Sequence, residues 1–199
     1  IYPFHWSIYQ WIKGENAYEI KPNNLNQAAK DIAHFILELQ SIPTQGATKA
    51  RRGYPLKSQD KAVREALLQI EDWGDGPTFE LMWTGYLNVP KWNSAPVWFH
   101  GDLLPQNLLV HNGFINAVID FGLMGIGDPA CDCLPAWSLF DAHSRSVFKE
   151  TLKVDDHTCE RGKGWALSIA LIILPFYRNR NQVLVDVAKR MVNELILEK

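Results

Sequence analysis

The sequence predicts a mostly helical α+β fold with one small β-hairpin near its centre. Three observations lead to this prediction. Apolar residues recur at three- and four-residue steps over residues 25–39 and over most of the chain beyond residue 134. Short β-type runs begin only at residue 97 and surround His111-Asn112-Gly113, a strong hairpin signal. The 199 residues are 47% hydrophobic and 21% charged, a composition typical of a domain that buries one large core.

The first elements follow from a change of period along the chain. Residues 4–12 mix aromatic and β-branched side chains, which favours a short extended segment that leads into a turn at Lys13-Gly14-Glu15. Asn24 is a candidate N-cap for an amphipathic helix over residues 25–39. Residues 44–57 contain arginine, glycine and proline without a period, so we expect a loop there.

Two further helices should precede the strands. Ser58 is a candidate cap for a helix that carries Val63, Leu67 and Ile70 on one face and ends at residues 73–76. A third, shorter helix is expected over residues 79–87.

The strands are predicted at residues 97–99, 107–110 and 114–119, and Gly125-Ile126-Gly127 is interpreted as a loop. Asp128-Pro129 then combines a capping side chain with a proline suited to a first helical position. The rest of the chain is expected to be helical, over residues 134–142, 144–152, 156–174 and 181–197.

Composition excludes several classes of function. The formal net charge is −2, from 20 basic and 22 acidic residues without long runs of one sign, so we expect neither a nucleic-acid nor a membrane partner. The most apolar stretch, residues 166–174, is much shorter than the ~20 residues that cross a bilayer. Cys131, Cys133 and Cys159 form neither a disulfide pattern nor a zinc motif, and we therefore expect a reducing, cytoplasmic setting.

Polar residues gather around the predicted hairpin, in His100-Gly101-Asp102 and its continuation to Asn107, and in Ile119-Asp120-Phe121-Gly122. Phosphoryl transfer needs such a set, because it depends on positioning a hydroxyl nucleophile and on metal ions that neutralise phosphate charge. Asp102 is the candidate catalytic base. Asn107 and Asp120 offer a neutral and a charged oxygen, which suits Mg²⁺. A two-metal phosphatase that uses His100, Asp102 and Asp120 is a weaker alternative, because the sequence shows no further ligands at metal spacing.

Three neighbouring polar residues are expected to support this loop rather than to react. The ring of His100 should brace the loop. Asp128 is interpreted as a helix cap, and Asp132 as a carboxylate that holds the loop in place.

The spacing of Asp102, Asn107 and Asp120 resembles the catalytic loop and the metal-binding Asp-Phe-Gly of the protein-kinase superfold. His-Gly-Asp in place of His-Arg-Asp is similar to the aminoglycoside phosphotransferase family. Further segments resemble that family: the opening residues 2–15, Gly-Asp-Pro-Ala-Cys-Asp at 127–132, and Arg-Gly-Lys-Gly-Trp-Ala-Leu at 161–167.

This resemblance implies the C-terminal lobe of a protein-kinase-like fold. Residues 1–14 would be the hinge from a missing N-terminal lobe, and residues 15–199 the phosphotransferase lobe with its catalytic loop at 100–107 and Asp-Phe-Gly at 120–122. The cofactors implied are Mg²⁺ and ATP or GTP. The backbone of Gln10, Trp11 and Ile12 would bind the adenine edge at the hinge.

The acceptor is expected to be the hydroxyl of a small molecule. Only five residues separate Gly122 from Asp128, which leaves no room for a phosphorylatable activation loop. An aminoglycoside would need carboxylates around the cleft, although the same acidic residues are equally well read as solvated charges at helix ends. These candidates are Asp141, Asp155, Asp156 and Glu160.

Two function hypotheses from different classes therefore stand. The first is an ATP- and Mg²⁺-dependent phosphotransferase that acts on a small-molecule hydroxyl, with an aminoglycoside antibiotic as one acceptor. The second is a catalytically incomplete, pseudokinase-like lobe or binding module, because the chain contains neither the glycine-rich loop nor the strand lysine of kinases. With a lobe missing, apolar surface near residues 1–12 would be exposed and would favour dimers.

Overall fold

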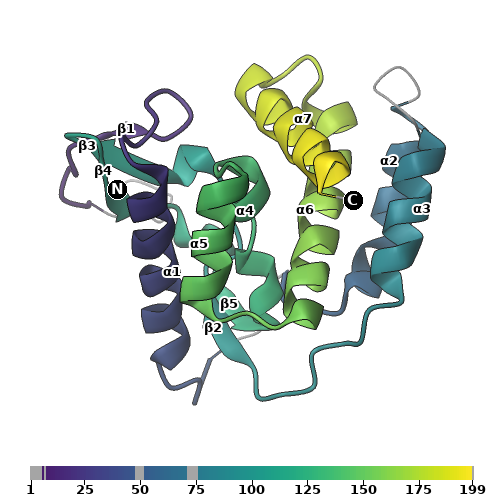
Figure 1. Ribbon diagram of the computed structural model, residues 1–199, viewed down its shortest axis with the longest axis horizontal. Helices are drawn as coiled ribbons and strands as arrows, with labels where there is room; N and C mark the ends of the chain where they lie inside the picture. Colours follow the sequence, from purple (N-terminus) through teal and green to yellow (C-terminus); the bar gives the residue numbers. More distant parts are fainter. Residues whose placement is uncertain (1–5, 7, 48–51, 71–75, 199) are drawn as a thin grey trace.

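The computed structural model describes residues 6, 8–47, 52–70 and 76–198, and all statements about the fold concern these residues. They form a mostly helical α+β fold, as predicted (Figure 1). The helices are α1 (Leu25–Ser41), α2 (Asp60–Leu67), α3 (Gly76–Leu87), α4 (Pro135–Ser138), α5 (Ala142–Leu152), α6 (Asp156–Tyr177) and α7 (Gln182–Leu197). The strands are β1 (Glu15–Asn16), β2 (Val97–Phe99), β3 (Leu108–His111), β4 (Phe114–Val118) and β5 (Gly125–Gly127). Short 3₁₀ turns cover Leu56–Gln59, Pro105–Asn107, Phe121–Leu123 and Pro129–Asp132.

Helix α1 forms where the apolar period predicts it. The side chain of Asn24 accepts a hydrogen bond from the backbone N–H of Gln27 at 3.1 Å, and so satisfies one of the N–H groups that a helix start leaves free. The apolar face, which includes Ile32 and Ile36, is buried, and α1 packs along α5 (Figure 1). The amphipathic pattern thus fixes both the helix and its orientation.

The predicted hairpin is confirmed and belongs to a sheet with strand order β1-β3-β4. Asn112 and Gly113 both have positive φ, 51° and 83°, which is the conformation that tight hairpin turns require. Asn107, expected to open the first strand, lies instead in the 3₁₀ turn that precedes β3. Both the catalytic-loop end and the Asp120 end of the hairpin therefore lie at the same edge of the sheet.

A second sheet pairs β2 with β5, and here the interpretation of residues 125–127 as a loop was wrong. Phe99 lies opposite Gly125 and Val97 opposite Gly127 in an antiparallel ladder. The segment Gly125-Ile126-Gly127 has little strand propensity, so its extended form depends on the partner strand about 28 residues earlier in the chain.

Other element boundaries also differ from the sequence predictions. The second helix starts at Asp60, after a 3₁₀ turn that contains Ser58, and ends at Leu67 without a capping side chain. The helix expected over residues 134–142 is only α4, because Asp141 turns out to cap α5. Helix α6 continues through Pro175 to Tyr177, although the proline cannot donate a backbone hydrogen bond to the preceding turn.

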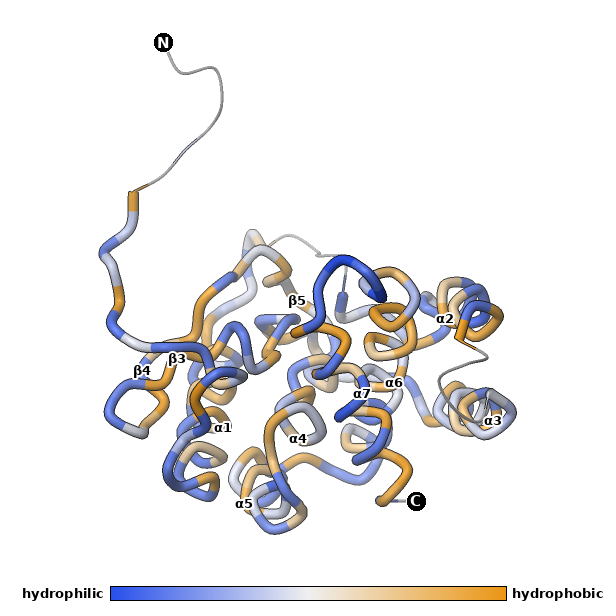
Figure 2. Tube along the Cα trace, turned by 90° about the horizontal axis from the view of Figure 1, so that it is seen from above, coloured by the Kyte–Doolittle hydropathy of each residue, from blue (hydrophilic) through white to orange (hydrophobic). Residues whose placement is uncertain are grey.

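Three expectations reach beyond the described residues. Residues 1–5 and 7 of the expected extended segment, residues 48–51 of the loop, and residues 71–75 at the end of the second helix lie outside that range. Residues 6 and 8–14 form no strand, and the strand begins instead at Glu15, where a turn was expected. This segment stands away from the body of the molecule (Figure 2), and Trp11 is 88% exposed.

The core lies between α6 and the elements around it. Helix α6 contacts α7 on one side and α2 and α3 on the other (Figure 1). Trp83, Trp137 and Trp165 are all buried in this core. The three cysteines are free thiols. Among the described segments, no helix combines the length and apolarity needed to span a bilayer.

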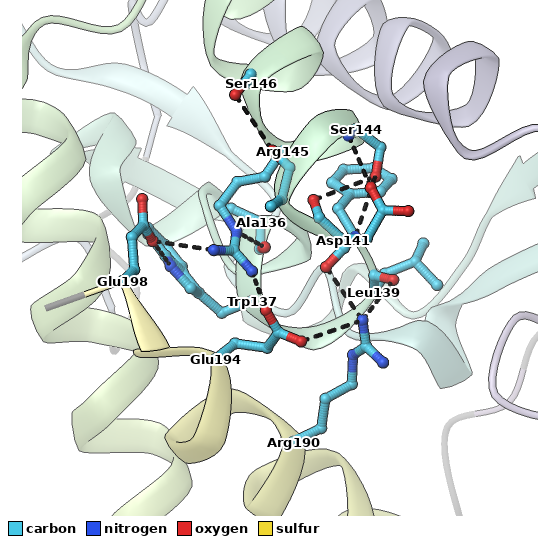
Figure 3. Close-up of polar contacts among 12 residues, drawn as sticks. Ala136, Trp137, Leu139, Asp141, Ser144, Arg145, Ser146, Arg190, Glu194 and Glu198 are labelled. Carbon is cyan, nitrogen blue, oxygen red and sulfur yellow. Dashed lines mark hydrogen bonds and ion pairs between the residues drawn. The ribbon is translucent and has the colours of Figure 1, made fainter. Parts of the chain in front are cut away.

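A cluster of charged side chains ties α7 to α4 and α5 (Figure 3). The buried guanidinium of Arg145 donates hydrogen bonds to the carboxylates of Glu194 and Glu198 and, at 2.7 Å, to the carbonyl of Ala136. Trp137 Nε1 donates to Glu198 at 2.6 Å. Since the Arg145 side chain is only 6% exposed, its charge depends on these acceptors.

Glu194→Ala is expected to lower the free energy of unfolding by about 2 kcal/mol, because it leaves a buried guanidinium with fewer acceptors. Urea unfolding measures this change. The control is Glu80→Ala, which removes an ion pair to Arg64 between side chains that are 60% and 46% exposed and is expected to cost less than about 1 kcal/mol. Equal losses in the two variants would contradict the assignment of Arg145 as a buried, dependent charge.

Candidate functional site

The side chain of Asp132 holds the start of the loop at residues 100–107. The two carboxylate oxygens of Asp132 accept the backbone N–H groups of His100 and Gly101, each at 2.7 Å. Asp132 itself is fully buried. Burial raises its pKa to about 6, although the two N–H donors act in the opposite direction. Gly101 has φ +82° and its backbone passes so close to the Leu123 carbonyl that a side chain would collide with it.

The imidazole of His100 braces the loop through both ring nitrogens. The backbone N–H of Asp102 donates to Nδ1 at 3.2 Å, so Nε2 carries the proton and donates to the carbonyl of Ile119 at 3.0 Å. Burial lowers the pKa of His100, which keeps the ring neutral. The ring also packs edge-on against Phe121. His100 thereby links the catalytic loop to the segment that carries Asp120.

Asp102 and Asn107 meet directly. Asn107 Nδ2 donates to the backbone carbonyl of Asp102 at 2.8 Å and to its carboxylate Oδ2 at 3.0 Å. The carboxylate of Asp102 is 20% exposed, so a ligand can reach it. None of the residues that the structure describes donates to Asn107 Oδ1, and this amide oxygen is therefore available to a cation.

Asp120 has a left-handed backbone, with φ 62° and ψ 67°, which is uncommon for a residue other than glycine. Its side chain accepts from the N–H of Gly122 at 3.3 Å and is exposed to solvent. The strained conformation turns the chain sharply after β4. The Asp120 carboxylate therefore lies at the open end of the hairpin. Asn107, which directly precedes β3, lies at the same end.

The predicted hinge and Asp120 line one cavity of about 1040 Å³. Its lining includes the extended segment at Gln10, Trp11 and Ile12. It also includes residues of the hairpin and of the turn at Asp120. The predicted hinge and the predicted metal ligand Asp120 are thus brought together, whereas Asn107 is not among the lining residues. The remaining lining residues are Tyr9, Gly14, Leu109, Val118, Ile119, Phe121 and Gly122.

Sequence reasoning missed Arg52, which was included in an expected loop. Its Nη1 donates to Asp102 Oδ1 at 2.9 Å and also to the carbonyl of Gly101. The arginine lies 50 positions before its partner, and no local pattern predicts such a contact. The sequence signal nearest to it is Gly53, the following residue. In the structure Gly53 has φ +77°, a conformation that favours glycine.

The buried carboxylate of Asp128 both caps a 3₁₀ turn and pairs with an arginine. Its Oδ1 accepts the N–H of Ala130 at 3.0 Å and caps the 3₁₀ turn that ends at Asp132. Arg161 from α6 pairs with the same carboxylate, with Nε 2.7 Å from Oδ2. Both side chains are only 5% exposed, so they stabilise each other out of contact with solvent.

The four acidic residues proposed for acceptor binding do not meet at Asp102. Asp141 caps α5 through the N–H of Ser144. Asp155 caps α6 and binds Thr158 with both carboxylate oxygens. Asp156 and Glu160 line a separate pocket together with three lysines, Lys149, Lys153 and Lys163.

The described part of the chain contains no group of three or more His, Cys, Asp or Glu side chains with metal-binding geometry. The two-metal phosphatase alternative gains no support from it. An Asn–Asp pair that shares Mg²⁺ with phosphate oxygens needs no such group.

The chain is similar to known phosphotransferases in sequence and in fold. The sequence profile of the phosphotransferase enzyme family matches residues 1–166. An aminoglycoside 3'-phosphotransferase from Escherichia coli is 23% identical over 152 residues, which cover 71% of this chain and 55% of the relative. The chain therefore spans about half the length of this curated relative.

Solved structures show the same fold. The GDP complex of an aminoglycoside 2'-phosphotransferase aligns with a TM-score of 0.66 at 17% identity, over 96% of this chain and 70% of that one. A macrolide 2'-phosphotransferase from Brachybacterium faecium aligns with 0.56 at 18% identity, over 92% and 68%. A spectinomycin phosphotransferase bound to ADP and spectinomycin aligns with 0.58 at 15% identity, over 92% and 65%.

Asp132→Asn is expected to change how stability depends on pH. The folded-state pKa of about 6 exceeds the ordinary 3.8, so the folded protein binds more protons in this range and the contribution of Asp132 to stability falls as pH rises from about 4 to about 6. The fall is roughly 3 kcal/mol at most. In urea unfolding, the stability of the wild type relative to the variant should therefore decrease over that range, and a constant difference would contradict the assignment.

Asp155→Asn is a control, because the contribution of Asp155 to stability changes with pH in the opposite direction. The N–H of Thr158 holds the pKa of Asp155 below its ordinary value, so its contribution is present at neutral pH and is lost as pH falls through that lowered pKa.

Proposed function

The chain belongs to the phosphotransferase enzyme family, and we propose that it transfers the γ-phosphoryl group of ATP or GTP to a hydroxyl of a small molecule. The observation that carries this proposal is the contact between Asp102 and Asn107 beside the cavity that holds Asp120. Asp120 lines this nucleotide-sized cavity, and the Asp102–Asn107 pair lies at the same end of the hairpin. A base, an amide oxygen and a carboxylate are the set that phosphoryl transfer requires.

Asp102 acts as the base in the proposed reaction. It accepts the proton of the acceptor hydroxyl while the hydroxyl oxygen forms a bond to the γ-phosphorus. The bond between that phosphorus and the β–γ bridging oxygen breaks, and the nucleoside diphosphate leaves. Asn107 orients the Asp102 carboxylate through its Nδ2 donor, so that the base is fixed before the acceptor arrives.

Mg²⁺ is the metal that this donor set suits. Asn107 Oδ1 has no competing donor among the described residues, and the Asp120 carboxylate is exposed at the same end of the hairpin. When bound, the ion neutralises charge on the phosphates. Gln10, Trp11 and Ile12 would bind the purine edge through their backbone, within a linker formed by residues 1–14 that leads into the phosphotransferase lobe of residues 15–199.

Asp102→Asn is expected to lower kcat by about 10²- to 10⁴-fold, because the amide keeps the shape but loses the base. Turnover should be measured with ATP and with GTP against a panel of alcohols, on the longest form that the reading frame encodes. Asp31→Asn, at a partly exposed position in α1 whose carboxylate accepts from Gln27, is the matched control and should leave turnover unchanged. Full activity in Asp102→Asn would exclude the mechanism, and wild-type nucleotide binding without any turnover would favour a binding module.

The exposed apolar side chains before β1 are proposed to mediate self-association. Trp6, Ile8, Tyr9 and Trp11 are between 66% and 88% exposed, which forms an unusual apolar segment. Light scattering on the 199-residue chain is expected to show dimers at high concentration. Ile8→Ser combined with Trp11→Ser should shift the chain towards monomer, and a wild type that stays strictly monomeric would contradict the proposal.

A further inference from the structure

A second, smaller cavity lies beside the catalytic loop, on the side of Arg52. Its volume is about 240 Å³, and a cavity of about 150 Å³ already admits a benzene ring. Its walls are mostly apolar and include two aromatic rings, Tyr54 and Trp92. Arg52 lines this cavity and also contacts the Asp102 carboxylate, so one side chain links the cavity to the proposed base. We call it the Arg52 pocket. Its other lining residues are Gly53, Pro55, Pro96, Ile126, Gly127 and Asp128.

Arg52 is held rigidly even though it lies outside the regular elements. The carbonyl of Gly53 accepts the N–H of Asp128 at 3.1 Å. A Cβ placed on Gly53 would lie 2.2 Å from the Phe99 ring, and one on Gly127 would lie 2.4 Å from the Gly53 carbonyl oxygen. This backbone therefore rests directly on β2 and β5. The β2–β5 ladder thus fixes where the guanidinium stands.

The guanidinium retains hydrogen-bonding capacity towards a ligand. Of its five N–H bonds, two serve Gly101 and Asp102, both through Nη1. No residue within the described ranges accepts from Nε or Nη2. Arg52 lines the pocket, and these remaining donors can bond to a molecule whose hydroxyl approaches Asp102.

The carboxylates at the pocket are already paired. Asp128, the acidic residue in its lining, is bound by Arg161 Nε at 2.7 Å and Nη2 at 3.3 Å. Asp102 is bound by Arg52. An ammonium group beside the reacting hydroxyl would therefore meet a guanidinium and no unpaired carboxylate of the lining, which costs binding energy.

We propose that the Arg52 pocket is the acceptor subsite, and that it takes an alcohol with an apolar ring or chain and a hydrogen-bond-accepting oxygen next to the reacting hydroxyl. The apolar part packs against Tyr54 and Trp92, and the oxygen accepts from Arg52. An acceptor with an ammonium group at that position is selected against. The inference rests on the proposed phosphotransferase function, since it assigns the acceptor of that reaction.

Three probes that share one phenyl ring test the proposal: 3-phenyllactate, 3-phenylpropane-1,2-diol and phenylalaninol. They carry a carboxylate, a hydroxyl or an ammonium next to the reacting alcohol. With the longest encoded form, ATP and Mg²⁺, kcat/KM is expected to be at least about tenfold higher for either oxygen probe than for phenylalaninol. The ranking of the first two shows whether the oxygen is preferred charged or neutral. Phenylalaninol as the best acceptor would overturn the proposal.

Variants separate recognition from a general loss of structure. Arg52→Gln is expected to lower kcat/KM for the oxygen probes about tenfold and to reduce the discrimination against phenylalaninol, whereas a merely structural role would lower all three equally and leave the ratio intact. Trp92→Ala should weaken all three probes equally. Arg64→Gln, at an exposed arginine, is the control and should change neither value. An unchanged ratio in Arg52→Gln would overturn the proposal.

Binding without nucleotide distinguishes failure of the inference from failure of the proposed function. Tryptophan fluorescence of the wild type and of Trp92→Ala measures the affinity for each probe. Arg52-dependent binding of the oxygen probes without turnover supports the pocket and removes the phosphotransferase function. Turnover of other alcohols without any binding or discrimination among these probes keeps the function and removes the inference.

Discussion

The buried carboxylate of Asp132 is the interaction on which the site depends. It accepts the N–H groups of His100 and Gly101 and so fixes the start of the catalytic loop against the 3₁₀ turn that follows Asp128. Burial raises its pKa, which means that charge is kept in the interior at a cost in stability. In return, the carboxylate holds the start of the loop at residues 100–107 in one conformation. Asp102 and Asn107 then take their positions from the backbone of this loop.

Five aspartates considered for the site fall into two groups with different environments. Asp141 and Asp155 use their oxygens to cap helices, and Asp128 is neutralised by a buried arginine. These contacts fix structure. Asp102 and Asp120 remain partly or fully accessible at the edge of the hairpin, where a ligand can reach them. Accessibility together with position, rather than residue type, is what separates the candidate catalytic carboxylates from the structural ones.

The segment between α1 and β2 contributes to the site as well as to the fold. Its helices α2 and α3 pack on α6, and its loops place Arg52 and Trp92 in the lining of the Arg52 pocket. The close approach of Gly53 to Phe99 and Gly127 connects this segment to the β2–β5 sheet. An arginine next to the proposed base, with apolar neighbours, makes this side of the site chemically different from an acidic cleft. Under the proposed function, variation in this segment would change the acceptor and leave the phosphate chemistry in place.

The sequence by itself determined the elements whose signals are local. Helix α1 follows from a 3.6-residue period and the Asn24 cap, the hairpin from Asn112-Gly113, and the candidate base and metal ligands from the spacing of Asp102, Asn107 and Asp120. Only the tertiary structure decided what depends on distant partners. Strand β5 forms because β2 is beside it, Asp141 caps a helix instead of continuing one, and Arg52 reaches Asp102 across 50 residues. Such contacts gain their energy from burial and pairing that no local window contains, so they appear only when the chain is folded.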